Sequence, residues 1–198
     1  MIVFKESELA HKYCIGEGIE IGGAAHNPFN IKGCLQVAPK LTPKIRKFWD
    51  DDQIRMCGTK IEPDIWADAE NIPLPDNSQD FIITSHVIEH VLNPLNAFRE
   101  WNRILKSGGV VFMIFPKRDA EPLDRDKPIS TLQSFINQYQ NPKILSEKND
   151  HLWIFTLQLM LDIHQWCNAN GVTDWEVVEA LETDDKVGNG HCTVFRKR

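Results

Sequence analysis

Two segments combine acids, imidazoles and glycines at spacings that suit ligand binding or proton transfer. In the first, Glu20 stands shortly before the pair Gly22 and Gly23, so a carboxylate adjoins backbone that a ligand can approach closely. This combination suits a polar, positively charged ligand. In the second, His86 and His90 lie close together in the chain, and imidazoles exchange protons near neutral pH. The two segments therefore predict a binding site that contains bases.

The second segment also matches a metal-binding pattern. His86, Glu89 and His90 form the His-x-x-Glu-His sequence of inverted zinc proteases, whose two imidazoles lie on one helical face. Here the pattern directly follows an apolar run that predicts a strand, which is not the setting of those proteases. We therefore expect no metal site, and treat His86, His90 and the more distant His151 as candidate bases. Packing at the start of a helix is an equally good explanation of His90.

Short apolar runs bounded by Gly, Pro, Asn and Asp indicate the strands that must hold these residues. The predicted strands are 18–22, 34–38, 64–68, 81–85, 110–115, 175–181 and 192–195. The fifth is apolar throughout, as a strand covered on both faces would be. The last two have no helix between them, which predicts an antiparallel hairpin.

Helical spacing of apolar residues predicts a helix over 94–106, ended by Gly108 and Gly109 as a C-cap. Further helices are expected over 131–139 and 155–168. We expect Asp50 to Asp52 to form a solvated turn, and 184–190 to form a hairpin turn. His151 and Trp153 lie in a loop, where acceptor specificity is often determined, and are expected to line an acceptor wall.

Strands that alternate with helices predict an α/β fold with a mostly parallel sheet, helices on both faces and the antiparallel C-terminal hairpin. Ligands bind such sheets outside the carboxyl ends of the strands, where the strand order reverses. The candidate residues follow strands at that edge. We expect residues 1–198 to form a single domain.

Composition excludes several classes of protein. There are 22 Lys and Arg against 28 Asp and Glu, a net charge of -6, and no long basic run, so we expect no nucleic-acid partner. The 5 cysteines are odd in number and lack a Cys-x-x-Cys pair, which favours a reducing, cytoplasmic location. No apolar stretch is long enough to cross a bilayer, so no membrane partner is expected. We expect a monomer or a homodimer.

Residues 68–90 and 103–112 resemble the class I S-adenosylmethionine-dependent methyltransferases, and in particular their type 11-like members. The matching features are an acid and a small residue, a Pro-rich stretch before the fourth strand, and Arg103-Ile-Leu-Lys-Ser-Gly-Gly before the fifth. The resemblance covers about residues 16 to 118. It implies a Rossmann-like sandwich with a seven-stranded sheet, and S-adenosylmethionine as cofactor.

The resemblance also assigns roles to residues at the strand ends. By this assignment, Glu20, Gly22 and Gly23 contact the methionine part of the cofactor, Asp68 and Ala69 its adenine, and Ser85 and His86 the floor beside the sulfonium. Two features differ from the family pattern. Ala24 and His26 replace glycines of the first loop, and the second strand ends at Ala38, where the family usually has an acid that holds the ribose hydroxyls.

The resemblance implies methyl transfer by in-line displacement. The acidic composition, with no nucleic-acid or membrane module expected, favours a small-molecule or sugar-type acceptor, whose proton His86, His90 or His151 would remove. The alternative is a non-catalytic binding or assembly protein that keeps the methyltransferase fold but has a weakened or lost cofactor site. A nicotinamide-dependent reductase is disfavoured, because the first turn lacks Gly-x-Gly-x-x-Gly.

Overall fold

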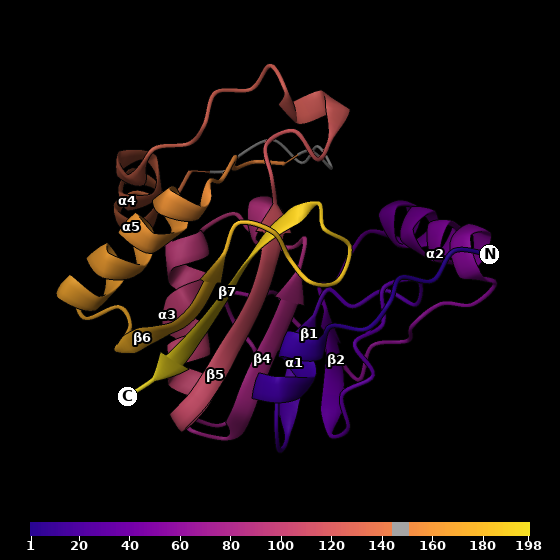
Figure 1. The fold of residues 1–198 in the computed structure, drawn as a ribbon, viewed down its shortest axis with the longest axis horizontal. Coiled ribbons are helices and arrows are strands. Elements are labelled where there is room, and N and C mark those ends of the chain that lie inside the picture. Colours follow the sequence, from indigo (N-terminus) through magenta and orange to yellow (C-terminus); the bar gives the residue numbers. More distant parts are fainter. Residues whose placement is uncertain (144–150) are drawn as a thin grey trace.

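A seven-stranded sheet in the order β3-β2-β1-β4-β5-β7-β6 forms the centre of the computed structural model, which describes residues 1–143 and 151–198 (Figure 1). The strands are β1 (Gly18–Ile21), β2 (Cys34–Ala38), β3 (Ile65–Trp66), β4 (Gln79–Ser85), β5 (Leu105–Pro116), β6 (Trp175–Leu181) and β7 (Gly190–Lys197). β7 is antiparallel to both β5 and β6, and the other pairs are parallel. The predicted fold class and the C-terminal hairpin are confirmed.

The strand order reverses between β1 and β4. From β1 the sheet continues to β2 and β3 in one direction, and from β4 to β5 in the other. Ile21 lies opposite Thr84 in the parallel register, so Gly22 and Ser85 follow neighbouring strand ends. This is the edge at which open α/β sheets bind ligands.

Residues of β5 alternate between two apolar layers, which explains its uninterrupted apolar sequence. Val111, Met113 and Phe115 belong to the core beneath α3 (Pro94–Ile104), α4 (Leu132–Gln140) and α5 (Leu157–Ala169). Phe112 and Ile114 belong to the core beneath α1 (Glu8–Tyr13). Figure 1 shows α1 and α3 on opposite sides of the sheet. Among the described residues, no helix is long and apolar enough to span a bilayer.

The prediction of a solvated turn at Asp50 to Asp52 was wrong. These aspartates lie within α2 (Pro43–Cys57), which begins after the N-cap Thr42 and ends at Gly58, with φ of 83°. Asp50 forms ion pairs with Arg46 at 2.8 Å and Lys60 at 2.7 Å. The three aspartates therefore lie on a helix and pair with basic side chains, and their consecutive positions in the sequence do not indicate a turn.

The prediction that Gly108 and Gly109 cap a helix was also wrong. α3 ends at Ile104, and β5 begins at Leu105 and includes both glycines. The register with β4 shifts between Leu105, opposite Gln79, and Val110, opposite Phe81, so the glycines occupy an irregularity in the strand. Gly108 has φ of 81°, and a Cβ on Gly109 would lie 3.0 Å from the carbonyl oxygen of Asp80.

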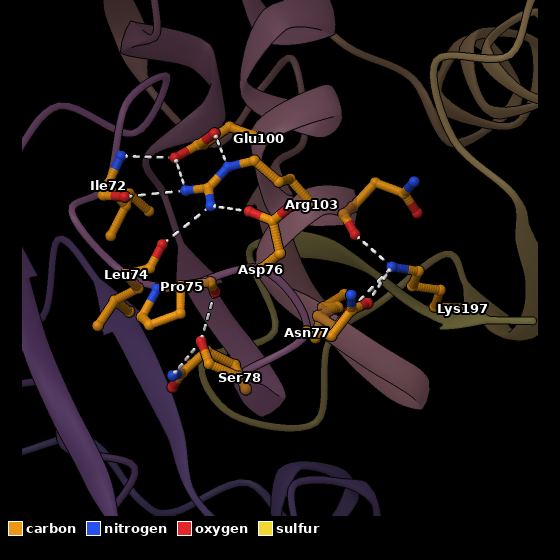
Figure 2. A network of polar contacts seen from close by, with 12 residues as sticks. Ile72, Leu74, Pro75, Asp76, Asn77, Ser78, Glu100, Arg103 and Lys197 are labelled. Atoms are coloured by element: carbon orange, nitrogen blue, oxygen red, sulfur yellow. Dashed lines mark hydrogen bonds and ion pairs between the residues drawn. The ribbon is translucent and has the colours of Figure 1, made fainter.

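Arg103 at the end of α3 holds the connection between β3 and β4 in place (Figure 2). Its guanidinium donates two hydrogen bonds to Glu100, at 2.8 and 2.7 Å, and one to Asp76 at 2.6 Å. It also donates to the carbonyls of Leu74 and Ile72. One side chain thus fixes a segment that has no regular secondary structure of its own.

Candidate active site

The turn after β1 is packed closely against the residues around it. Gly22 has φ of 73°, and a Cβ added there would lie 2.4 Å from Cγ2 of Val87. A Cβ on Gly23 would lie 2.0 Å from Oε1 of Gln36. Asn27 of the same loop donates from Nδ2 to Oγ of Ser85 at 3.4 Å. Gly22 is therefore required by its positive φ and by the contact with Val87, whereas a side chain at Gly23 would displace the flexible end of Gln36.

Glu20 is 5% exposed and its Oε2 accepts a hydrogen bond from Nε2 of Gln36 at 2.9 Å. Burial raises the pKa of Glu20 to about 7, against the opposing effects of this hydrogen bond and of the Lys186 charge. Oε1 of Gln36 is itself buried, and within the described part of the chain it accepts no hydrogen bond. Beside Glu20 of β1, the neighbouring strand β2 thus holds a buried oxygen that accepts no hydrogen bond from any described residue.

Asp68 and Ala69 form the turn that follows β3. The Asp68 side chain is exposed, and its carbonyl accepts from the backbone N–H of Asn71 at 3.0 Å. The carbonyl of Ala69 accepts from Nε1 of the buried Trp101 at 3.0 Å. The turn is thereby anchored to α3 and leaves the Asp68 carboxylate facing solvent.

His86 follows Ser85 at the end of β4 and has a left-handed backbone, with φ of 54°. Its N–H donates to the carbonyl of Ile114 at 3.0 Å, which extends the pairing of β4 with β5. Burial lowers the pKa of His86, against the opposing effect of the Asp184 carboxylate. Strain of this kind is typical of residues whose orientation a site requires.

Glu89 lies in a short 3₁₀ helix, Ile88–His90, and is fully buried. Neither of its carboxylate oxygens has a hydrogen-bond partner among residues 1–143 and 151–198. Burial raises the pKa of Glu89 to about 8. Oε1 lies 3.8 Å from Nδ1 of His86 and 3.9 Å from Nε2 of His151.

His151 approaches this carboxylate from a distant part of the sequence. The backbone N–H groups of Leu152 and Trp153 donate to the carbonyl of Glu89 at 2.8 and 3.2 Å, which holds the 151–153 segment against the 3₁₀ helix. The rings of His151 and His90 meet edge to face with centroids 4.8 Å apart. The ligand atoms of Glu89, His90 and His151 all lie within 4.8 Å of one another.

Asp124 orients the His151 ring. Its carboxylate contacts Nδ1 of His151, which leaves Nε2 directed at Glu89. Lys127 lies 3.0 Å from the other oxygen of Asp124 and donates to the carbonyl of His151 at 3.2 Å. The imidazole is thus held by one acid and turned toward another, an arrangement that serves either a base or a metal ligand.

The fold is that of known methyltransferases. A SAM-dependent methyltransferase of Aquifex aeolicus superposes with a TM-score of 0.54 over 98% of this chain and 89% of that chain, at 14% identity. Residues 49–113 match the model of a family described as "Methyltransferase domain". The chain therefore has the fold of the class I S-adenosylmethionine-dependent methyltransferases, and its residues 49–113 are similar to that family.

Relatives of this chain include proteins with and without an assigned activity. It is 30% identical over 129 residues to an uncharacterised protein of Methanocaldococcus jannaschii, and 45% identical over 47 residues to the malonyl-(acyl-carrier protein) O-methyltransferase of a Marinomonas species. The overlaps cover 59% and 24% of this chain. The chain spans 57% of the length of the first relative and 17% of the second.

The fold brings together most, but not all, of the residues singled out from sequence. Gly22, Gly23, Ser85 and His86 lie around the adjacent ends of β1 and β4. Asp68 and Ala69 follow β3, the outermost of the parallel strands, so they lie at the same edge of the sheet but farther from β4. Trp153, expected in an acceptor wall, is 6% exposed, donates from Nε1 to the carbonyl of Val91 at 2.8 Å, and packs in the core.

Sequence reasoning missed parts of this site. Gln36 lies in mid-strand and carried no signal. Asp124 carried none either, because its pairing with His151 depends on tertiary structure. Glu89 was recognised in the His-x-x-Glu-His pattern, but its burial and its contact with His151 were not foreseen.

Proposed function

We propose that this chain binds S-adenosylmethionine and transfers its methyl group to a hydroxyl of a small-molecule or sugar-type acceptor. The observation that carries the proposal is the convergence of His86, His90 and His151 on Glu89, immediately after the end of β4. This position adjoins the first loop, because Val87 packs against Gly22. Proton-transfer groups therefore stand next to the place where the cofactor of the family would be held.

The residues at the β1 end fit the methionine part of the cofactor. Oε1 of Gln36 and Oδ1 of Asn27 are buried and, in the part of the chain that the structure describes, accept no hydrogen bond. An ammonium group offers three N–H donors, and the Glu20 carboxylate beside Gln36 offers a charge of opposite sign. When bound, the cofactor supplies a sulfonium-activated methyl group that an acceptor oxygen takes up by in-line displacement.

The chain's own contribution is to position the acceptor and remove its proton. His151 has Nδ1 held by Asp124, so Nε2 is the ring atom available to an acceptor hydroxyl or to another ligand. A groove of about 720 Å³ has Lys117, Phe155, Asn189 and His191 among its lining residues, and Asn189 forms a side-chain hydrogen bond with His86. Its volume lies in the range of small-molecule sites, which supports a small acceptor.

The cofactor part of the proposal is tested by calorimetry with S-adenosylmethionine. We expect binding with one molecule per chain, and at least tenfold weaker binding by the Gln36→Leu variant. Ser78→Ala is the matched control. The Ser78 hydroxyl donates to the Pro75 carbonyl just before β4 begins, at the end of the strand away from the site. Absence of binding at millimolar cofactor would overturn the proposal.

The chemical part is tested by single-turnover methyl transfer across a panel of hydroxyl-bearing small molecules. Replacement of His86, His90 and His151 by Ala, one at a time, should lower the rate 10²- to 10⁴-fold at the position that handles the proton. Unchanged rates in all three variants would leave proximity alone as the source of rate and remove histidine from the mechanism.

A non-catalytic binding or assembly role is the second candidate, and the end of β2 favours it. Ala38 provides no carboxylate for the ribose hydroxyls, and Pro39 follows without a backbone donor. This candidate predicts weak or absent cofactor binding and no turnover on any acceptor. Turnover on one acceptor would eliminate it.

A further inference from the structure

The Glu89 carboxylate is buried in a way that a bound cation would explain. It is fully enclosed, and within residues 1–143 and 151–198 neither oxygen accepts a hydrogen bond. Buried carboxylates are ordinarily paired, hydrogen-bonded or bound to a metal. The groups that face it, His86, His90 and His151, all carry ring nitrogens, which are metal ligands when neutral.

We propose that Glu89, His90 and His151 bind a divalent metal ion. Their ligand atoms lie within 4.8 Å of one another, and metal–ligand distances of about 2.0 to 2.2 Å place tetrahedral ligand atoms about 3.4 Å apart, so the widest separation must shorten by up to about 1.4 Å. Two imidazoles and one carboxylate favour Zn²⁺, Mn²⁺, Fe²⁺ or Co²⁺ over Mg²⁺ and Ca²⁺, which prefer all-oxygen sites. The site departs from the zinc-protease pattern, because the third ligand is the distant His151 and not His86.

The surroundings support a ligand role for His151. The ring nitrogen of a metal-bound histidine that does not bind the metal commonly donates an N–H hydrogen bond to a carboxylate. Nδ1 of His151 contacts Asp124 in this way. Asp124 is itself buried and held by Lys127 at 3.0 Å. The cluster therefore contains two carboxylates and one ammonium group. With both carboxylates ionised its net charge is negative, and a bound divalent cation would make it positive.

A role for the metal in methyl transfer rests on the proposed function. Three protein ligands leave coordination positions open, as in catalytic metal sites. A hydroxyl bound at such a position releases its proton to water more readily than a free hydroxyl does. The acceptor class is then a small molecule with a hydroxyl that can reach both the metal and the cofactor.

Calorimetry of the full chain, stripped with a chelator and titrated with Mn²⁺, Zn²⁺ or Co²⁺ in the absence of cofactor, tests metal binding by itself. We expect one ion per chain and, for Co²⁺, visible absorption bands from the bound ion. Glu89→Gln, His90→Ala and His151→Ala should each weaken binding at least 100-fold, and Asp124→Asn about 10-fold. His11→Ala, which removes a half-exposed imidazole elsewhere, should leave it unchanged.

The outcome separates this inference from the proposed function. Thermal unfolding of each variant identifies any that has not folded, and the remaining ligand variants still decide the result. Metal affinity that is absent, or unchanged in the folded ligand variants, overturns the metal site. If no metal binds but the stripped protein still binds S-adenosylmethionine, the metal site is excluded and the proposed function stands. If metal binds but S-adenosylmethionine does not, the metal site stands and the proposed function is excluded.

Discussion

Nε2 of His151 lies 3.9 Å from Oε1 of Glu89, although α3, β5 and α4 separate the two residues in the sequence. The contact depends on backbone hydrogen bonds from Leu152 and Trp153 to the Glu89 carbonyl, and on Asp124, which orients the ring. The chemistry of the site is thus assembled where a loop from the second half of the chain meets the end of β4. Variants in the supporting structure should therefore affect the site from a distance.

Gly22→Ala should disturb the first loop by steric overlap as well as by backbone strain. The new Cβ would lie 2.4 Å from Val87, so we expect a loss of about 2 kcal/mol in unfolding free energy and at least tenfold weaker cofactor binding. Urea denaturation and calorimetry measure the two effects. Gly58→Ala is the matched control, with φ of 83° and nothing within 4 Å of the added Cβ.

Addition of Val87→Ala to Gly22→Ala removes the steric part of this cost. The double variant should recover cofactor binding beyond that of Gly22→Ala while keeping the strain of a positive φ. Equal losses in Gly22→Ala and Gly58→Ala would show that strain alone acts at both positions.

Glu20 should make stability fall as pH rises. Its folded pKa, about 7, lies above the ordinary glutamate pKa of 4.5, so between these values the folded state binds more protons than the unfolded state. The stability is fully present below pH 4.5 and decreases until the pH exceeds 7, by at most about 3 kcal/mol. Urea denaturation at pH 5 and pH 8 should show a smaller decrease for Glu20→Gln than for the wild type. An identical pH dependence in the two proteins would contradict the assignment.

Arg103→Met should loosen the connection between β3 and β4. The substitution removes the paired hydrogen bonds to Glu100 and those to Asp76 and two carbonyls, so we expect a loss of about 2 kcal/mol in unfolding free energy. Arg99→Met, on the same helix, removes an exposed contact with Asn96 and should cost less than about 0.5 kcal/mol. Similar losses in both variants would mean that the network is not the cause.

Asp184→Asn should destabilise the loop between β6 and β7. The Asp184 carboxylate is 4% exposed and accepts from the N–H groups of Lys186, Val187, Gly188 and Gly190 at 2.7 to 3.0 Å. An amide replaces one acceptor by a donor that faces these N–H groups, which should cost about 3 kcal/mol. Thermal unfolding measures the loss against Asp126→Asn, an exposed acid in another loop. A change no larger than that control would exclude a structural role for the carboxylate.

The strands were predictable because each is a short apolar run bounded by residues that favour turns. The antiparallel hairpin followed from the absence of a helix between residues 181 and 190, and β6 and β7 pair as expected. β3 is shorter than the predicted 64–68, because only Ile65 and Trp66 pair with β2. The errors arose where local signals had a second explanation. Glycines at 108 and 109 allow a strand irregularity as readily as a helix end, and a run of aspartates can sit on a helix among basic partners.

Only those site residues that come directly after a predicted strand could be placed from the sequence. Gly22 and Ser85 were expected to meet because neighbouring parallel strands end together. The contact between His151 and Glu89 was not predictable, since it depends on hydrogen bonds from Leu152 and Trp153 to the distant Glu89 carbonyl. The burial of Glu89 was equally hidden, because His-x-x-Glu-His gives no indication of which side chain faces inward.

The position of β7 has a consequence for how the chain acquires its structure during synthesis. β7 follows every other strand in the sequence yet lies between β5 and β6, with register from Val110 opposite Arg196 to Pro116 opposite Gly190. Until residues 190–197 leave the ribosome, one edge of the apolar strand β5 has no partner strand. Closure of the sheet must then wait for the last strand, so contacts of long sequence separation limit the rate of folding. A nascent chain that stops before Gly190 carries an open apolar edge, the kind of surface on which chaperones and aggregation compete.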